Sequence, residues 1–467
     1  MNLERIKNII IFSLVLLSVY QTGRLWFEYN SSRNFFYTFF TPVNSQINDK
    51  SEQMKFLAIP FRSITNFGNR TFAIDHTSQN VSCDEVIEAA LLRGNFLEAK
   101  SLDWSELLKP KSVIYDYAVQ LAFADFSAAF IQRTSNAGSR IRNIDSVVIV
   151  PRQSSGRDLE VYFIDESANT SYLYEVSESL LNQELNASIN EKQTESEKFF
   201  YISTIQNGFD IFKGNQFVPK WADDIYEYNT ITYSNPYAQD GEVLLYGIEP
   251  KIDMLFDNPT YKSEPYIKTN RSNNGEDIEY VYVYLCETSV VKYYPNGVLE
   301  YSDFRPANRT LPVSFSNAYA RAMSFIQRDQ EISNDIYLFD YVYNENQAEY
   351  IFYYDYVVNN MPIIFTESFE RETGMKHGIE ITVKNNVVTK YKRYTCKFEI
   401  NEDISINAAV NFSSAIDVMI ENNFDEVNEA QNLIQDILLA YKFEKEKFML
   451  WNWYMHIDDK LYSMPAQ

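Results

Sequence analysis

The sequence is poor in cysteine, histidine and glycine, and these shortages exclude several classes of protein. Its 467 residues include three cysteines, three histidines and 13 glycines. Cys83, Cys286 and Cys396 lie far apart and form no Cys-x-x-Cys pair, so neither a disulfide framework nor a zinc site is predicted. We expect the three thiols to be buried and neutral.

Basic residues are also scarce relative to acidic ones. The chain has 41 Lys and Arg against 64 Asp and Glu, a formal net charge of −23. Such a chain repels phosphate backbones, so nucleic acid is not predicted as a partner. Aromatic residues are plentiful, with 35 Tyr and 33 Phe. Because these residues suit pleated, half-buried surfaces, they favour β-rich domains.

No signature of catalysis is present. His76, His377 and His456 lack the neighbours of a catalytic or metal site, and the common hydrolase, dinucleotide and nucleotide motifs are missing. Asp75, His76 and Cys83 are close in sequence, yet nothing there indicates a positioned base. The sequence therefore predicts no catalytic, cofactor-binding or metal-ligating residue, and His456 is expected to line a strand.

The amino end predicts a membrane anchor. Residues 1–28 read as a short cytoplasmic tail followed by an apolar helix over about 6–27, with Lys7 and Arg24 near its ends. A cleaved signal peptide is the alternative, although "SVYQTG" is a poor cleavage site. The positive charge at the start places this end in the cytoplasm, so the rest is expected outside the cell membrane.

Within the predicted anchor, Ser13, Ser18 and Gly23 are the small residues that permit close approach of a second helix. They are our candidates for contact with a partner's transmembrane helix. The alternative is that they are ordinary anchor residues.

The outer part predicts a juxtamembrane segment at 29–55 and three domains at 56–145, 146–290 and 291–467. Hairpins are expected at 145–165, around Pro-Asn-Gly 295–297 and around 384–386. The apolar spacing predicts helices over 83–93, 112–132, 180–189, 314–328 and 405–422, and strands within 241–256. Helix-then-strands occurs twice after residue 291, so the predicted class is α+β, with antiparallel sheets each covered by helices.

The closing stretch "KFMLWNWYMHI", 447–457, alternates strictly. Met449, Trp451, Trp453, Met455 and Ile457 fall on one face, which predicts a core face covered by the helix at 405–422. The opposite face is mixed, and its Tyr454 and His456 are the candidates for a contact surface.

These features resemble the YycH (WalH) family. "ERIKNIIIFSLVLLS" is similar to the family's amino anchor, and "YYPNGVLEYS", 293–302, resembles one of its hairpins. The ending also resembles YycH and its smaller sister YycI: a helix, a strand with Ala440 and Tyr441, an aromatic strand with a Trp, and a short "KLY" strand. One departure is Trp451-Asn452-Trp453, where the family would have Pro-x-Trp.

The resemblance implies a regulator without chemistry of its own. Members of that family are single-pass, extracytoplasmic proteins that modulate the WalK sensor kinase, which oversees cell-wall homeostasis in Gram-positive bacteria. It implies a YycI-like sister protein and a WalK-like kinase as partners, through anchor and outer domains, and no cofactor. A surface enzyme and an anchored binding module for wall fragments or peptides remain the alternatives.

Overall fold

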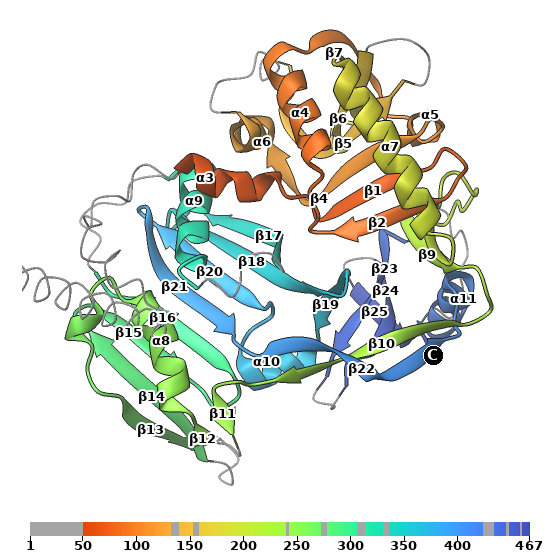
Figure 1. The fold of residues 1–467 in the computed structure, drawn as a ribbon. Coiled ribbons are helices and arrows are strands. Elements are labelled where there is room, and N and C mark those ends of the chain that lie inside the picture. Colours follow the sequence, from red (N-terminus) through yellow and green to blue (C-terminus); the bar gives the residue numbers. More distant parts are fainter. Residues whose placement is uncertain are drawn as a thin grey trace, which may run out of the picture. The chain divides into compact units, whose positions relative to one another are not determined.

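The structure is a computed structural model and describes residues 50–131, 140–152, 158–239, 242–271, 278–305, 313–329, 336–423, 434–444, 448–457 and 460–467 (Figure 1). The predicted anchor, with Ser13, Ser18 and Gly23, lies outside these ranges. The chain divides into two units, Met1–Lys50 and Ser51–Gln467, and the second is described here. In the ranges described, no helix has both the length and the apolar character needed to cross a membrane.

The amino-terminal half of the second unit forms one nine-stranded sheet within the described residues. Its order is β3-β7-β6-β5-β4-β1-β2-β8-β9, and each neighbouring pair is antiparallel. The strands are β1 Arg62–Asn66, β2 Phe72–His76, β3 Asn95–Ser101, β4 Ser112–Ala122, β5 Asn143–Pro151, β6 Asp158–Asp165, β7 Thr170–Ser177, β8 Phe199–Ser203 and β9 Phe217–Trp221.

Helices cover one face of this sheet, and a shorter element covers part of the other. α4 (Val81–Arg93), α6 (Phe123–Phe130) and α7 (Ser179–Glu195) pack on the first face, and Figure 1 shows α4 and α7 crossing it. The side chain of Asn80 caps α4 by accepting hydrogen bonds from two main-chain N–H groups. On the second face, α5 (Trp104–Leu107) contributes Leu107 to a smaller apolar cluster. The predicted helices at 83–93 and 180–189 are confirmed.

The predicted helix at 112–132 is wrong over its first part. Residues 112–122 form β4, and only 123–130 are helical. Val113 and Tyr115 point into the larger apolar cluster, whereas Ile114 points into the smaller one. Because both faces are covered over the first part of the strand, Val113, Ile114 and Tyr115 are all apolar, and such a run can be mistaken for part of a helix.

The second large sheet has twelve strands among the described residues, in the order β13-β14-β15-β16-β21-β20-β18-β19-β23-β24-β25, with β17 also paired to β18. Its pairs are antiparallel except for the parallel pair β19–β23. The strands are β13 Tyr266–Arg271, β14 Ile278–Cys286, β15 Ser289–Tyr293, β16 Val298–Asp303, β17 Ile336–Asn344, β18 Glu349–Val358, β19 Met361–Phe365, β20 Ile379–Lys384, β21 Val387–Tyr394, β23 Asp436–Phe443, β24 Trp451–Ile457 and β25 Lys460–Pro465.

Four helices accompany this sheet in the part of the chain described: α8 (Leu245–Leu255), α9 (Phe315–Ile326), α10 (Glu367–Thr373) and α11 (Phe412–Asn423). α9 contacts β18, β20 and β21, and α11 contacts β24 and β25. The predicted helix at 314–328 is confirmed, as are the hairpins at 145–165, 295–297 and 384–386. Gly297 has a φ of +94°, a conformation that glycine adopts without strain.

Two further predictions need correction. The strand expectation for 241–256 holds only for the two-residue strand β12 (Glu242–Val243), because α8 occupies most of the rest and buries Ile248, Ile252 and Leu255 at helical spacing. The helix expected at 405–422 begins only at Phe412. Residues 397–408 form β22 (Lys397–Ala408), which pairs with β10 (Tyr226–Ser234) as a separate two-stranded ribbon.

The α+β class with antiparallel sheets is confirmed. Residues 145 and 290, where composition placed the domain limits, lie inside β5 and β15, and each of these strands pairs on both sides. The sheets therefore do not divide at those positions. The limits of independently folding domains stay a prediction.

The predicted core face of the closing strand is confirmed. Met449, Trp451, Trp453, Met455 and Ile457 are all buried. The indole N–H of Trp453 donates to the main-chain oxygen of Val410, 2.8 Å away, just before α11. Trp451 stacks on Tyr228 of β10, with ring centroids 4.0 Å apart. The cover of this face thus comes from α11 and also from the ribbon strand β10.

Candidate functional site

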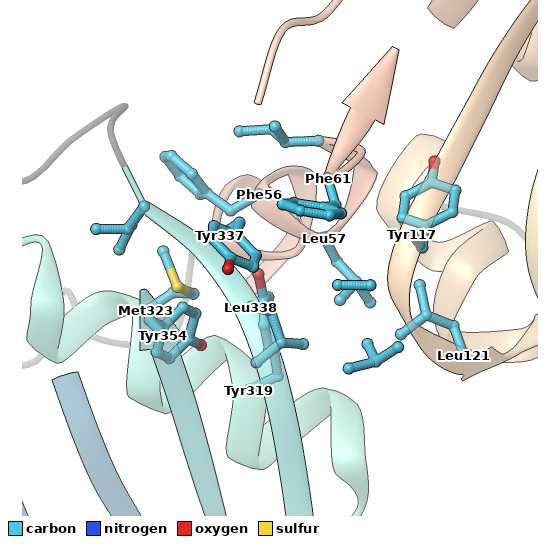
Figure 2. Close-up of a pocket in the computed structure, with 14 residues that line it drawn as sticks. Phe56, Leu57, Phe61, Tyr117, Leu121, Tyr319, Met323, Tyr337, Leu338 and Tyr354 are labelled. Atoms are coloured by element: carbon cyan, nitrogen blue, oxygen red, sulfur yellow. The ribbon is translucent and has the colours of Figure 1, made fainter. Parts of the chain in front are cut away.

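The two large sheets meet at a small apolar cavity. On the side of the first sheet it is bounded by β4 and by the 3-10 helix η2 (Lys55–Ala58), and on the other side by α9, β17 and β18 (Figure 2). Its volume is about 40 Å³. The lining residues are Phe56, Leu57, Ile59, Phe61, Tyr117, Ala118, Val119, Leu121, Tyr319, Met323, Ile336, Tyr337, Leu338 and Tyr354.

Six of the 14 residues that line this cavity are aromatic. Phe61 and Tyr337 lie side by side in Figure 2, and their ring centroids are 4.4 Å apart. The hydroxyl of Tyr117 donates to the main-chain oxygen of Ala58, which ties η2 to β4. The hydroxyl of Tyr354 is buried without a hydrogen-bond partner in the described residues. A void of this size is far below the several hundred Å³ of ordinary ligand sites, so it reads as a gap in packing between two layers.

A second contact between the sheets is polar and lies beside the cavity. Asn360, in the turn between β18 and β19, reaches the open edge of β2. Its side-chain oxygen accepts from the main-chain N–H of His76 at 2.6 Å, and its side-chain nitrogen donates to the main-chain oxygen of Ile74 at 2.8 Å. The side chain thereby imitates one residue of a neighbouring strand. We call the cavity-lining residues together with Asn360 and His76 the joint.

His76 completes the joint as a neutral ring. Its Nδ1 lies 2.9 Å from the main-chain oxygen of Asn360, and since a carbonyl only accepts, Nδ1 carries the proton. Nε2 is buried without a partner among the described residues. Burial, and next the positive charge of Arg62, lower the pKa of His76 to about 3.

Replacing Asn360 with alanine is expected to lower the free energy of unfolding by about 1–3 kcal/mol. The variant loses two hydrogen bonds to main-chain groups of β2, and it places alanine at a φ of 58°. Urea unfolding followed by tryptophan fluorescence measures the change. Asn386→Ala, in the β20–β21 turn at a φ of 61°, is the matched control. It measures the cost of placing alanine at a positive φ without the contact to β2. Equal losses in the two variants would mean that the docking contact contributes nothing.

The buried His76 also predicts a pH dependence. Its folded pKa lies below the unfolded value of about 6.5, so the unfolded chain binds the extra proton as pH falls. Stability from this group is therefore complete above pH 6.5 and declines as pH falls towards 3, by about 2 kcal/mol between pH 7 and 5. Urea unfolding of wild type and His76→Gln across this range tests it. The difference in unfolding free energy between wild type and His76→Gln should become smaller as pH falls. If the two unfolding free energies change with pH in parallel, the lowered pKa of His76 is contradicted.

The residues singled out from the sequence have varied surroundings. Tyr454 is 4% exposed and its hydroxyl has no hydrogen-bond partner in the described part, whereas His456 is half-buried in β24. Only His456 of the pair therefore presents appreciable surface, and the contact role of this face stays a prediction. Cys83, Cys286 and Cys396 are free and buried, as expected.

The Asp75, His76 and Cys83 stretch does not assemble a nucleophile and base. Asp75 pairs with Lys192 of α7 at 2.9 Å, and His76 is engaged by Asn360. Burial, and next the charge of Asp84, raise the pKa of the Cys83 thiol well above its usual range. No group of three or more metal-ligating side chains occurs within the ranges that the structure describes.

The sequence reasoning missed the joint. A turn signal was present, because Asn359-Asn360 separates two apolar runs and both residues adopt positive φ. That signal predicts a hairpin but not the strand, 284 residues away, on which its tip docks.

The architecture defines a class before any comparison: an α+β protein in which two large, mainly antiparallel sheets share a joint. No family model matches the chain, and no curated protein is significantly similar to it. A solved structure is similar, namely YycH from Bacillus subtilis, with a TM-score of 0.53 at 12% identity. The match covers 88% of this chain and 95% of that one, so the chain has a YycH-like fold.

Proposed function

We propose that this protein is a membrane-anchored, extracytoplasmic regulator that modulates a WalK-like sensor kinase through protein contacts, together with a YycI-like partner. The observation that carries the proposal is the YycH-like fold over 88% of the chain. The predicted single anchor, the sequence features similar to that family and the absence of a catalytic motif in the sequence support it. In this proposal the protein is not an enzyme and needs no cofactor.

The joint offers a physical route for regulation. η2 directly follows the segment that leads from the predicted anchor, and Phe56 and Leu57 of η2 line the cavity with residues from both sheets. A partner beside the anchor could displace this segment. Such a displacement would change the packing of η2 against both β4 and β17. Packed interiors switch between discrete arrangements, and a gap at the contact leaves room for a second one.

Co-purification from detergent-solubilised membranes tests the proposal. The full chain should recover a WalK-like kinase and a YycI-like protein, and replacing residues 6–27 with an unrelated anchor should reduce that recovery several-fold. Unchanged recovery after the exchange would remove the anchor from the mechanism, and no recovery by the native chain would contradict the proposal. Reproducible turnover of a substrate that is lost on His76→Ala or Cys83→Ala would make the protein an enzyme instead.

A second candidate is a binding module for wall fragments or peptides. An open groove of about 440 Å³ runs beside the edge strand β3, which is large enough for a small ligand. Leu107, Val150 and Leu173 form its apolar floor, and its rim carries charged groups: Glu98, Lys100, Asp103 and Glu106. Titration calorimetry with soluble wall fragments tests it. Binding that is lost in Leu173→Glu would favour this function over kinase regulation.

A further inference from the structure

His377 occupies an unusual position beside the joint. It precedes β20, and its Nδ1 lies 2.9 Å from the carboxylate of Asp355 on β18. Its ring contacts two aromatic rings, with centroid distances of 4.7 Å to Phe339 and 4.9 Å to Tyr353. Phe339 is the extra residue of a β-bulge in β17, so its contact with His377 depends on that local distortion of the strand.

Asp355 joins this histidine to the sheet. It is only 3% exposed, and its second oxygen accepts from the main-chain N–H of Gly378 at 2.9 Å. Gly378 itself is packed so closely that an added Cβ would lie 2.4 Å from the ring of Tyr356. One buried carboxylate therefore accepts hydrogen bonds from both residues of the 377–378 turn, and Gly378 has no room for a side chain.

The charges that face His377 are nearly all negative. Asp355 comes from β18, Asp340 from β17 and Glu380 from β20, and all three favour the protonated ring. The nearby cations are already engaged, since Lys376 pairs with Glu370 at 3.6 Å and Lys392 pairs with Glu300 at 3.2 Å. Both flanking aromatic faces also favour a cation. Tyr337 and Tyr353 are the other titratable groups of this surrounding.

β17 connects this position to the joint. Ile336, Tyr337 and Leu338 line the cavity, and Phe339 follows them directly. Two residues beyond, the hydroxyl of Tyr341 donates to the main-chain oxygen of Gln120 on β4, 3.3 Å away. The contact between His377 and Phe339 therefore acts on the same strand, β17, that contacts the first sheet.

We propose that His377 and Asp355 form a pH-responsive latch, in which the protonated ring holds the β17 bulge in place beside Asp355 and loss of the ring proton as pH rises loosens β17 at the joint. That this latch would read the pH outside the cell rests on the proposed function, while the latch itself does not. When the ring loses its proton, Asp355 stays buried with a weaker, neutral donor, and attraction to Asp340 and Glu380 disappears.

The direction of the pH effect follows from the surroundings. Burial alone would lower the pKa of His377, but the hydrogen bond and charge of Asp355, with Glu380 and Asp340, outweigh it and raise the pKa above its usual value. A histidine with a raised folded pKa stabilises the fold fully below the unfolded value of about 6.5, and this contribution is lost as pH rises through the folded value. The protonated ring therefore holds β17 at low pH, and this restraint is lost as pH rises.

Hydrogen exchange on the full chain in detergent tests the latch. Protection factors, which correct for the intrinsic pH dependence of exchange, should fall about tenfold in β17 (336–344) between pH 6 and 8.5 for each unit by which the pKa is raised. In His377→Gln, whose amide can still donate to Asp355 but carries no charge, β17 protection should not depend on pH. His456→Gln, in β24, is the matched control and should behave as wild type.

Two outcomes would overturn the proposal. One is the same pH dependence of β17 in wild type and His377→Gln. The other is an NMR titration that places the pKa of the His377 ring below 6.5. Neither measurement needs a kinase or a sister protein, so a failed latch and a failed co-purification can be told apart.

Discussion

Replacing Trp453 with alanine is expected to lower the free energy of unfolding by about 3–5 kcal/mol. The side chain is fully buried at the centre of the closing strand, and its ring packs on Trp221 of the first sheet, 6.4 Å between centroids. The variant opens a cavity under α11 and leaves the main-chain oxygen of Val410 without its indole donor. Urea unfolding followed by circular dichroism measures the loss without relying on tryptophan fluorescence.

Two further variants separate packing from hydrogen bonding. Trp453→Phe keeps an aromatic ring but lacks the N–H, so it should retain more than half of the lost stability. Leu461→Ala, on the neighbouring strand β25 and 58% exposed, is the control and should change stability by less than about 0.5 kcal/mol. A loss in Trp453→Ala as small as that of the control would show that this face is not a core face in solution.

Much of the fold could be predicted from local sequence patterns. In these segments the spacing of apolar and turn residues alone indicates the structure that forms. The closing strand alternates cleanly, since one face is all apolar, and the turns at 295–297 and 384–386 carry residues suited to positive φ. The helix α9 was predictable for the same reason, as its apolar residues share one side. In each of these cases the local preference and the final packing agree.

The failures occurred where packing on two sides hides the pattern. β4 is covered on both faces, so its apolar run carries no period-2 signal, and the helical spacing in α8 was overlooked in a stretch rich in β-branched and aromatic residues. The joint could not be predicted at all. Its contacts pair residues such as His76 and Asn360, or Phe61 and Tyr337, whose proximity depends on how two sheets meet.

The same limit applies to the surroundings of His377. The sequence predicts a contact role for Tyr454 and His456 because they lie on the mixed face of an alternating strand. His377 sits in no motif and was set aside for lack of catalytic neighbours. Its neighbours turn out to be carboxylates from three different strands, β17, β18 and β20, which only the sheet order brings together. Groups that perturb one another's ionisation are a better guide to regulation than isolated residue types.

Replacing Asp329 with asparagine is also expected to cost about 3–5 kcal/mol of unfolding free energy. Its carboxylate accepts from Lys251 of α8 at 2.5 Å and pairs with Arg393 of β21, and all three side chains are about nine-tenths buried. The neutral amide removes the negative charge that Lys251 and Arg393 both contact in a poorly solvated place. Because the carboxylate ties α8 to β21 just beyond the end of α9, the loss should appear as a lower urea midpoint.

A surface carboxylate supplies the matched control. Asp257 also bridges two cations, Arg328 at 3.1 Å and Arg305 at 3.4 Å, but its side chain is 49% exposed. Asp257→Asn should therefore cost less than about 1 kcal/mol, because water replaces the lost partner. Adding Lys251→Met to Asp329→Asn removes one of the two cations that the carboxylate contacts and should restore part of the stability. If the double variant is no more stable than Asp329→Asn alone, the loss comes from something other than an uncompensated buried charge.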